Sequence, residues 1–388
     1  MRIALVTHKF IRGDGQGRIN LEVALAALRR GWHVTLLASE VEDELLSHEN
    51  LSWIRIAVQR WPTALLKQQV FALCSAIWLR HNRTRVDVVL VNGYITWAAA
   101  DVNAVHFVHS AWREVPARQR EAGGLLSRVY HRFYTALNAR LERVAFRHSS
   151  HVIAVSAQVG RQLVGLGVAA DRLTVIPNGV DTGEFRPGDG GRSASGLPTG
   201  ELIALFVGDL QTPRKNLHTV LKALRECPEL HLAVVSTVGR SPYPALAGEL
   251  GVADRVHFLG FRRDVPRLMR EVDLVVYPSV YEPSGLVLLE GMSSGVPVVT
   301  TRSVGAAETV RAGCALVIEH PEDEVSLAQA LRSLASSPEL RRQMGEEGRR
   351  QALENDFAVM SHRYCDLIAR LAAVRERSSP RPLPASPS

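Results

Sequence analysis

The 388-residue chain has only four cysteines, and their positions limit the kinds of site it can contain. They are far apart in the sequence and lack the C-x-x-C spacing of many zinc and redox sites. Such cysteines are typical of scattered thiols in a reducing compartment, so neither a disulfide framework nor a metal centre is predicted. No Asp-x-Asp pair follows an expected strand either, and we expect no metal requirement. The cysteines are Cys74, Cys227, Cys314 and Cys365.

Long apolar runs and a leader pattern are also missing. No apolar run reaches the roughly 18 residues that a membrane span needs. The N-terminus, Met1-Arg-Ile-Ala-Leu-Val-Thr7, enters an expected strand directly and has no signal-peptide pattern. The composition, with 46% hydrophobic and 22% charged residues, is that of an ordinary globular protein. We therefore expect a cytoplasmic protein of two to three domains.

The positive charge is unevenly distributed. The net charge of +7 lies in residues 1–185, whereas residues 186–388 are neutral overall. Residues 105–150 alone contain eight arginines and three glutamates. Such a basic face is either simply solvated or docks on an anionic membrane surface, at about 1 kcal/mol per basic residue near the lipid. Nucleic acid is not an expected partner, because no helix-turn-helix, zinc-finger or aromatic RNA-binding signature accompanies the charge.

Short apolar strands alternate with amphipathic helices through both halves of the chain. The strand Arg2–Thr7 is followed by a glycine loop at residues 13–18, a helix over residues 19–30 and a second strand at Val34–Ala38. The same order restarts with the strand Ile203–Val207. Because strand alternates with helix, each half is predicted to be a parallel sheet covered on both faces, as in Rossmann-like α/β domains.

Domain limits follow from glycine and proline content. Residues 188–200 are rich in glycine and serine and mark the predicted boundary between a first domain, residues 1–185, and a second, residues 186–359. The tail, residues 376–388, is rich in proline and serine and is expected to be disordered.

Residues 61–79 form a predicted amphipathic helix. Its apolar side is expected to face the core, and a helix lying on a membrane is the alternative. The apolar residues are Leu65, Leu66, Val70, Leu73, Ile77 and Trp78.

A strand, a turn and a helix at residues 274–300 contain two glutamates. The strand ends at Tyr277, Glu282 lies in the turn, and Glu290 lies eight positions further on in a helix that begins near Gly285. Unpaired N–H groups at a helix N-terminus and the helix dipole favour an anion there. Arg214 and Lys215 follow another strand and are suited to charge-assisted hydrogen bonds with a pyrophosphate.

The sequence from Tyr277 to Thr300 resembles the E-x7-E motif of retaining glycosyltransferases with the GT-B fold, in particular family 4. The resemblance implies two Rossmann-like domains facing across a cleft, with a C-terminal helix at 360–375 that returns to the first domain. It also implies transfer of a sugar from a nucleoside-diphosphate sugar, with retention at the anomeric carbon and no further cofactor. The expected acceptor is a glycan or lipid-linked intermediate of cell-surface polysaccharide or glycolipid synthesis. With such an acceptor, peripheral contact of the protein with the inner face of the membrane is also expected.

The resemblance also assigns roles to residues. Glu290 is expected to accept hydrogen bonds from the ribose hydroxyls, and Glu282 is expected to hold hydroxyls of the donor sugar. His109 corresponds to a cleft histidine near the donor sugar or its leaving phosphate, although Ser110 stands where the family often has aspartate. The remaining expected contacts are the diphosphate clamp at Gly208, Arg214 and Lys215, the N–H groups of Ser284, Gly285 and Leu286, and the loop containing Gly15 and Gly17.

Two other functions remain open. An NAD-dependent oxidoreductase would use the Gly13–Gly17 loop and Glu40, but the G-x-G-x-x-G pattern fails at Arg18 and at Asn20. A non-catalytic nucleotide-sugar-binding subunit is the other alternative, and the intact pair of glutamates argues against it.

Overall fold

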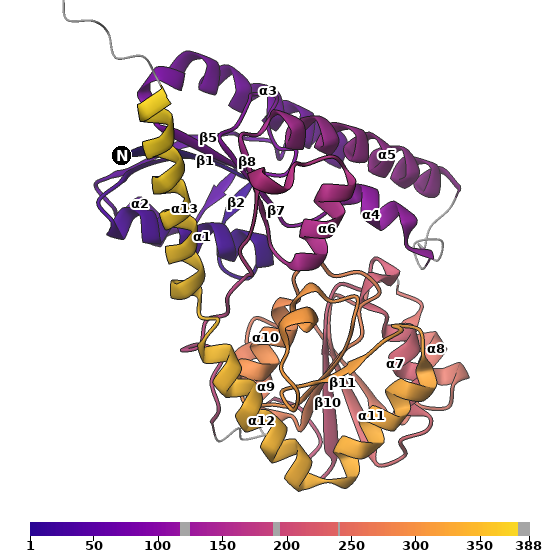
Figure 1. The fold of residues 1–388 in the computed structure, drawn as a ribbon. Coiled ribbons are helices and arrows are strands. Elements are labelled where there is room, and N and C mark those ends of the chain that lie inside the picture. The colour runs from indigo at the N-terminus through magenta and orange to yellow at the C-terminus, as the bar shows by residue number, and fades with distance from the viewer. Residues whose placement is uncertain (117–124, 189–194, 240, 379–388) are drawn as a thin grey trace, which may run out of the picture. The chain divides into compact units, whose positions relative to one another are not determined.

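The computed structural model describes residues 1–116, 125–188, 195–239 and 241–378, and within them the chain forms two parallel sheets flanked by helices (Figure 1). The first sheet has the strand order β5-β3-β1-β6-β7-β8-β9. The short strands β2 and β4 pair with each other in parallel and form a separate two-stranded sheet. The strands are β1 (Arg2–Val6), β2 (Lys9–Phe10), β3 (His33–Ala38), β4 (Glu40–Val41), β5 (Leu51–Arg55), β6 (Val88–Asn92), β7 (Val102–Val105), β8 (His151–Ala154) and β9 (Leu173–Val175).

The second sheet has the order β12-β11-β10-β13-β14-β15, with β10 and β13 at its centre. Alternate residues of β10 enter different cores: Ala204 and Phe206 pack in one cluster, and Ile203 and Leu205 pack in the other. This two-residue period buries both faces of the sheet, as predicted for a parallel sheet covered by helices. The strands are β10 (Leu202–Val207), β11 (Leu230–Val235), β12 (Val256–Gly260), β13 (Leu274–Tyr277), β14 (Val298–Thr301) and β15 (Leu316–Ile318).

The helices connect these strands and cover the sheets. Two 3-10 segments, η5 (Pro213–Lys215) and η7 (Gly305–Thr309), contribute to the site described below. No helix within the described ranges is long and apolar enough to cross a membrane. The helices are α1 (Gly15–Arg29), α2 (Asp43–Leu46), α3 (Ala64–Asn82), α4 (His109–Glu114), α5 (Leu125–His148), α6 (Ala157–Gly165), α7 (Leu217–Leu224), α8 (Tyr243–Glu249), α9 (Val265–Glu271), α10 (Leu286–Ser293), α11 (Glu324–Ser336), α12 (Pro338–Leu353) and α13 (Phe357–Ser378).

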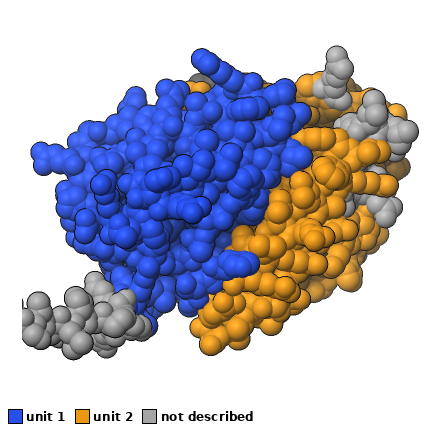
Figure 2. Space-filling model, turned by 90° about the horizontal axis from the view of Figure 1, so that it is seen from above, with its two compact units in different colours: residues 1–104, 148–152, 360–388 blue, residues 105–147, 153–359 orange. Residues whose placement is uncertain are grey.

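The chain divides into two compact units, coloured separately in Figure 2. One unit contains residues 1–104, 148–152 and 360 onward, and the other contains residues 105–147 and 153–359. Within the first unit α13, the yellow helix of Figure 1, lies against α1, where Arg30 forms an ion pair with Asp366 at 2.7 Å.

Residues from the predicted boundary and tail lie partly outside the described ranges. Of the glycine-rich stretch 188–200, residues 189–194 are not described, and of the tail, residues 379–388 are not described. Helix α13 continues to Ser378, three residues beyond the predicted end of that helix.

Helix α1 begins earlier than predicted. The glycine loop expected at residues 13–18 is largely the first turn of α1, because Asp14 caps the helix by accepting a hydrogen bond from the Gly17 N–H at 2.7 Å. Glycine lowers helix propensity, so the sequence favoured a loop where the aspartate cap and the packing of the following turns start a helix.

The prediction for α3 was right for only part of its apolar side. Leu66, Leu73 and Ile77 are exposed, whereas Val70 and Trp78 are partly buried and pack against the core with Phe71 and Leu79. The helix is apolar around most of its circumference, so apolar spacing alone did not identify the packed side.

Candidate active site

The turn after β13 is held by backbone hydrogen bonds to the loop after β14. The Glu282 N–H donates to the Ser303 carbonyl at 3.1 Å, and the Gly305 N–H donates to the Glu282 carbonyl at 2.8 Å. A Cβ on Gly305 would lie 2.0 Å from the Pro283 carbonyl oxygen, so only glycine permits this approach. Glu282 therefore belongs to a backbone that is fixed on both sides.

Gly285 starts α10 in a conformation that other residues rarely adopt. Its φ is 100°, and a Cβ there would lie 2.3 Å from a methyl group of Val304. The N–H groups of the following turn, at Leu286 and Val287, have no intrahelical acceptor and carry the positive end of the helix dipole. Ser284, just before, accepts a hydrogen bond at Oγ from the Asn178 side-chain amide at 2.8 Å.

Lys215 and Glu282 form a buried ion pair at the end of β13. The Lys215 ammonium lies 2.5 Å from Glu282 Oε2, and the Tyr277 hydroxyl donates to the same oxygen at 2.9 Å. Lys215 also donates to the Tyr277 hydroxyl. The side chains of Lys215 and Glu282 are only 12% and 13% exposed, so water screens this pair weakly.

The charges around Glu282 determine its protonation. Burial by itself would raise the pKa of Glu282, but Lys215 and Arg214 outweigh burial and hold the pKa below its usual value. Burial lowers the pKa of Lys215 and raises that of Tyr277 well above its usual value, with Glu282 opposing the first shift and reinforcing the second. The contacts are those of a lysine cation paired with a glutamate anion, with the phenol as a second donor to the carboxylate.

Arg214 is the more accessible of the two adjacent cations. Its guanidinium lies 3.7 Å from Glu282 Oε2 and 5.6 Å from the ring centroid of Phe107, and a quarter of its side chain is exposed. Arg214 and Lys215 belong to η5, which follows β10.

Gly208 provides the space that Lys215 occupies. A Cβ at residue 208 would lie 2.8 Å from Lys215 Cγ, so a larger residue would displace the lysine side chain. Gly208 was predicted as part of a diphosphate clamp, and the structure shows a packing contact between Gly208 and the side chain of Lys215.

Glu290 lies on α10 in different electrostatic surroundings. Its pKa is raised to about 7, first by burial and then by the neighbouring charge of Glu184, while Lys215 acts in the opposite sense. The charge of Lys215 therefore acts to lower the pKa of both glutamates, but only at Glu282, where Arg214 adds to it, is the effect of burial outweighed. A carboxyl group with this pKa changes protonation close to neutral pH.

His109 is linked to the Glu282 turn through aromatic side chains. Its ring lies 5.0 Å from that of Phe107, and Phe107 lies 5.4 Å from Tyr281. The Tyr281 hydroxyl donates to the Val108 carbonyl at 3.3 Å, and Trp112 stacks on the Tyr281 ring at 6.0 Å. These contacts fix the start of α4 to the turn that contains Glu282.

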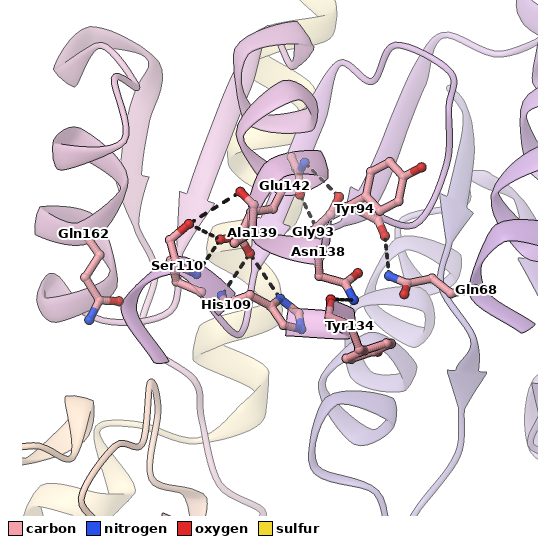
Figure 3. A network of polar contacts seen from close by, with 12 residues as sticks. Gln68, Gly93, Tyr94, His109, Ser110, Tyr134, Asn138, Ala139, Glu142 and Gln162 are labelled. Carbon is pink, nitrogen blue, oxygen red and sulfur yellow. Dashed lines mark hydrogen bonds and ion pairs between the residues drawn. The ribbon is translucent and has the colours of Figure 1, made fainter. Parts of the chain in front are cut away.

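A carboxylate from α5 holds the N-terminus of α4 (Figure 3). Glu142 accepts hydrogen bonds from the backbone N–H groups of His109 and Ser110 at 2.9 and 2.8 Å. Glu142 is 2% exposed. Strand β7 ends at Val105, and His109 is the first residue of α4.

Most residues predicted for the site share one compact unit. The Glu282, Lys215 and Arg214 cluster, Gly208, the Ser284–Leu286 turn, Glu290 and His109 all lie in the unit formed by residues 105–147 and 153–359. Gly15 and Gly17 belong to the other unit, in the first turn of α1.

Several residues of this site were not predicted from the sequence. Tyr277 and Tyr281 lie in or next to the turn that contains Glu282. Their closeness to Glu282 in the sequence was the signal that could have identified them. Glu142 could have been found as the only acid in an arginine-rich helix. The described residues contain no cluster of three His, Cys, Asp or Glu side chains arranged to hold a metal ion.

Two family models match the chain, one in each half of the sequence. The model described as "Glycosyltransferase Family 4" matches residues 13–184, and the model described as "Glycosyl transferases group 1" matches residues 191–351.

Curated relatives match over part of their length. The chain is 33% identical over 220 residues to the D-inositol 3-phosphate glycosyltransferase of Nocardia farcinica, covering 53% of this chain and 49% of the relative. It is 33% identical over 183 residues to the lipopolysaccharide glucosyltransferase WaaG of Escherichia coli, covering 46% of this chain and 49% of WaaG. The chain thus spans about half the length of the curated relatives it matches.

A solved structure extends the likeness to nearly the whole fold. Sucrose-phosphate synthase from Thermosynechococcus elongatus superposes with a TM-score of 0.81 at 20% identity, over 96% of this chain and 99% of the other. The two parallel α/β sheets and this likeness define the GT-B fold, which confirms the predicted fold class. With both family models matched, the chain belongs to the GT-B glycosyltransferases of the family 4 type.

Proposed function

We propose that this protein transfers a sugar from a nucleoside-diphosphate sugar to a glycan or lipid-linked acceptor, with retention at the anomeric carbon. The observation that carries the proposal is the cluster of two cations, Arg214 and Lys215, around Glu282. The second glutamate, Glu290, has a raised pKa that the charge of Lys215 partly offsets. This set of groups suits a ligand with a diphosphate and several hydroxyls, because the cations bind the anion and the carboxylates accept from hydroxyls.

The two cations act on the leaving group. When the bond between the anomeric carbon and the diphosphate oxygen breaks, its electron pair remains on that oxygen, and Arg214 and Lys215 stabilise the developing charge. The acceptor oxygen bonds to the same face of the sugar carbon, and its proton passes to the departing phosphate. A dedicated protein base is therefore not part of the proposal, and the cations fill the role that a divalent metal would otherwise have.

The two glutamates hold different parts of the donor. Glu282 remains ionised next to Lys215 and accepts hydrogen bonds from hydroxyls of the transferred sugar, near the reacting carbon. Glu290 accepts the two ribose hydroxyls in its ionised form, which predominates above a pH of about 7. The free N–H groups at the start of α10 point toward anionic or hydroxyl oxygens of the donor.

A thermal-shift panel tests the donor class. Nucleoside diphosphates and nucleotide sugars with uracil, guanine and adenine bases are compared with NAD at matched concentrations. One base is expected to stand out, because a ligand at a hundredfold excess over its Kd stabilises the folded state by about 2.7 kcal/mol. Stabilisation by NAD without any response to nucleotide sugars would favour the oxidoreductase.

Product stereochemistry tests retention. The anomeric proton of the first product formed is observed by NMR with the donor found in the panel, and the donor's own configuration is expected. Inversion would contradict the retaining mechanism. Donor binding without any transfer to a range of glycan and glycolipid acceptors would favour the non-catalytic binding subunit.

The exposed face of α5 supports a lipid-linked acceptor on a membrane. Val129, Phe133 and Val144 are 56%, 58% and 49% exposed and lie on the same helical face. This face also carries the exposed arginines Arg132, Arg140, Arg143 and Arg147. Exposed apolar groups between basic side chains suit peripheral contact with an anionic lipid surface. One relative, WaaG, is named for lipopolysaccharide synthesis.

Liposome flotation tests the membrane contact. Wild-type protein is expected to float with vesicles containing anionic lipid at low salt and to remain unbound with neutral vesicles. The double variant Arg140→Glu/Arg143→Glu should lose binding. The control Arg342→Glu/Arg350→Glu makes the same charge change on exposed positions of α12 and should bind normally. Equal binding by both variants would rule out α5 as the docking face.

A further inference from the structure

The only acid of α5, Glu142, is buried between this helix and the start of α4. Four donors surround its carboxylate: the backbone N–H and ring Nδ1 of His109, and the backbone N–H and hydroxyl of Ser110. The last two donate to Oε1 and the first two to Oε2, at distances of 2.8 to 3.1 Å. A buried acid with four direct hydrogen-bond donors holds those donors, here groups of His109 and Ser110, in fixed positions.

The geometry determines which ring nitrogen of His109 carries a proton. An ionised carboxylate only accepts hydrogen bonds, so His109 Nδ1, at 3.1 Å from Glu142 Oε2, must be the donor. When the ring is neutral, Nε2 is therefore the unprotonated nitrogen. Figure 3 shows Glu142 on the Nδ1 side of the ring, so Nε2 points away from the carboxylate. The His109 side chain is 26% exposed, and no partner for Nε2 is found within the described ranges.

The ring is also fixed in orientation by its neighbours. Phe107 contacts one edge at 5.0 Å, and Tyr134 of α5 lies 6.2 Å away. Through Phe107 the histidine is connected to Arg214, and through Arg214 to Glu282. The orientation set by Glu142 is therefore defined relative to the groups proposed to hold the donor.

We infer that Glu142 is a positioning residue that fixes His109 in the Nδ1–H tautomer, so that Nε2 accepts a hydrogen bond from a hydroxyl of the donor sugar. This inference rests on the proposed function, because it assigns a partner to His109 in the transfer reaction. Ser110 anchors the other oxygen of the carboxylate and prevents it from rotating. The chain's own residues thereby determine the direction and the acceptor character of the exposed nitrogen.

A glutamine at position 142 cannot replace the carboxylate. All four partners donate, whereas glutamine has a single acceptor oxygen and an amide group that itself donates. Whichever way the amide is turned, one backbone N–H loses its acceptor. When the NH2 of the glutamine faces His109, Nδ1 must accept its hydrogen bond, and the ring proton moves to Nε2.

The first test is the tautomer of wild-type His109 in nitrogen-15 NMR spectra of the full chain, with assignment by His109→Gln. The Nδ1–H tautomer is expected. The Nε2–H tautomer in wild type would overturn the inference, and this result does not depend on any transfer assay. Failure of the proposed function would appear separately, as a lack of response to every nucleotide sugar in the thermal-shift panel.

The second test compares turnover. Glu142→Gln should show mixed tautomers and a kcat lowered about 10- to 100-fold, with the KM for the donor changed less than about threefold. Glu142→Asp retains the carboxylate and should recover part of the loss. Thr135→Val is the control for stability of α5, since it removes a buried hydroxyl that bonds only within the helix. A folded Glu142→Gln protein with wild-type turnover would overturn the inference. If Glu142→Gln does not fold, the turnover of Glu142→Asp and the tautomer of His109 in the wild type test the inference in its place.

Discussion

The two ends of the E-x7-E segment differ in electrostatics although they are only eight residues apart. At the turn, Glu282 contacts Lys215 and lies within 3.7 Å of Arg214, and its pKa is lowered. In the helix, Glu290 is partly buried near Glu184, and its pKa is raised to about 7. Burial acts in the same direction on both carboxyl groups, so the neighbouring charges produce the difference. The comparison shows that one motif can provide a carboxylate that is ionised at neutral pH and a carboxyl group that titrates near neutral pH.

Removing the lysine should have the largest effect on this difference. Lys215→Ala leaves Glu282 buried without its closest cation, which destabilises the fold by about 3–5 kcal/mol and raises the pKa of Glu282 toward that of Glu290. Turnover should fall by at least about 10³-fold, because a charge that stabilises the leaving diphosphate is also lost. Thermal unfolding and transfer assays measure the two effects.

Lys222→Ala provides the matched control. Lys222 also pairs with a glutamate, Glu324, at 3.2 Å, but both side chains are well exposed and the pair should contribute less than about 1 kcal/mol. Similar losses in both variants would show that burial of the Lys215 pair has no special effect.

Neutralising the turn glutamate should separate chemistry from nucleotide binding. Glu282→Gln is expected to lower kcat by about 10²- to 10³-fold, since the amide holds the sugar hydroxyls less strongly in the transition state. The Kd for the nucleoside diphosphate alone should change less than about threefold, because that ligand lacks the sugar. Titration calorimetry and initial rates provide these values. A large loss of nucleoside diphosphate binding would place Glu282 on the nucleotide instead.

Neutralising the helix glutamate should instead weaken nucleotide binding. Glu290→Gln is expected to weaken nucleoside diphosphate binding by about 1–3 kcal/mol, because one charged acceptor of two ribose hydroxyls is replaced by a neutral amide. The matching 2′-deoxy nucleoside diphosphate should bind wild type and variant more equally. If the variant keeps full preference for the ribose form, Glu290 does not hold the ribose.

The raised pKa of Glu290 should also make stability depend on pH. The folded pKa of Glu290, about 7, lies above the usual value of 4.5, so the folded state binds the proton more tightly. Its stabilising contribution is present below about pH 4.5, decreases as the pH rises, and is lost above about pH 7. The difference corresponds to roughly 3 kcal/mol at most.

Denaturant unfolding of the ligand-free protein measures this dependence. Wild type should lose stability between about pH 5 and 8 relative to Glu290→Gln, which cannot titrate at this position. Parallel curves for the two proteins would mean that the Glu290 carboxyl keeps its ordinary pKa.

The sequence predicted the sheets well because their signal is local. Strands such as β10 and β13 are short apolar runs whose alternate residues enter different cores, and β-α alternation left parallel α/β as the consistent architecture. The motif glutamates and the Arg214–Lys215 pair were also recognisable from spacing and from the family resemblance. The roles assigned to them remain predictions.

Features that depend on tertiary contacts could not be predicted in the same way. An apolar helix such as α3 does not reveal which side will pack, and Leu73 and Ile77 proved to be exposed. The hydrogen bonds of Glu142 join α5 to α4, more than 30 residues away in sequence, so nothing local indicated them. The opposite pKa shifts of Glu282 and Glu290 likewise depend on residues from other elements, among them Lys215 and Glu184.

The most direct test is proton release on donor binding, measured by calorimetry at pH 7 in buffers with different ionisation enthalpies. A nucleotide sugar is the ligand of choice, because its diphosphate does not titrate near neutral pH. With a pKa of about 7, Glu290 is about half protonated, and the ribose hydroxyls require its ionised form. Wild type and Glu282→Gln should each release about half a proton per donor bound, and Glu290→Gln should release none. No release from wild type, or equal release from Glu290→Gln, would contradict the division of roles between the two glutamates.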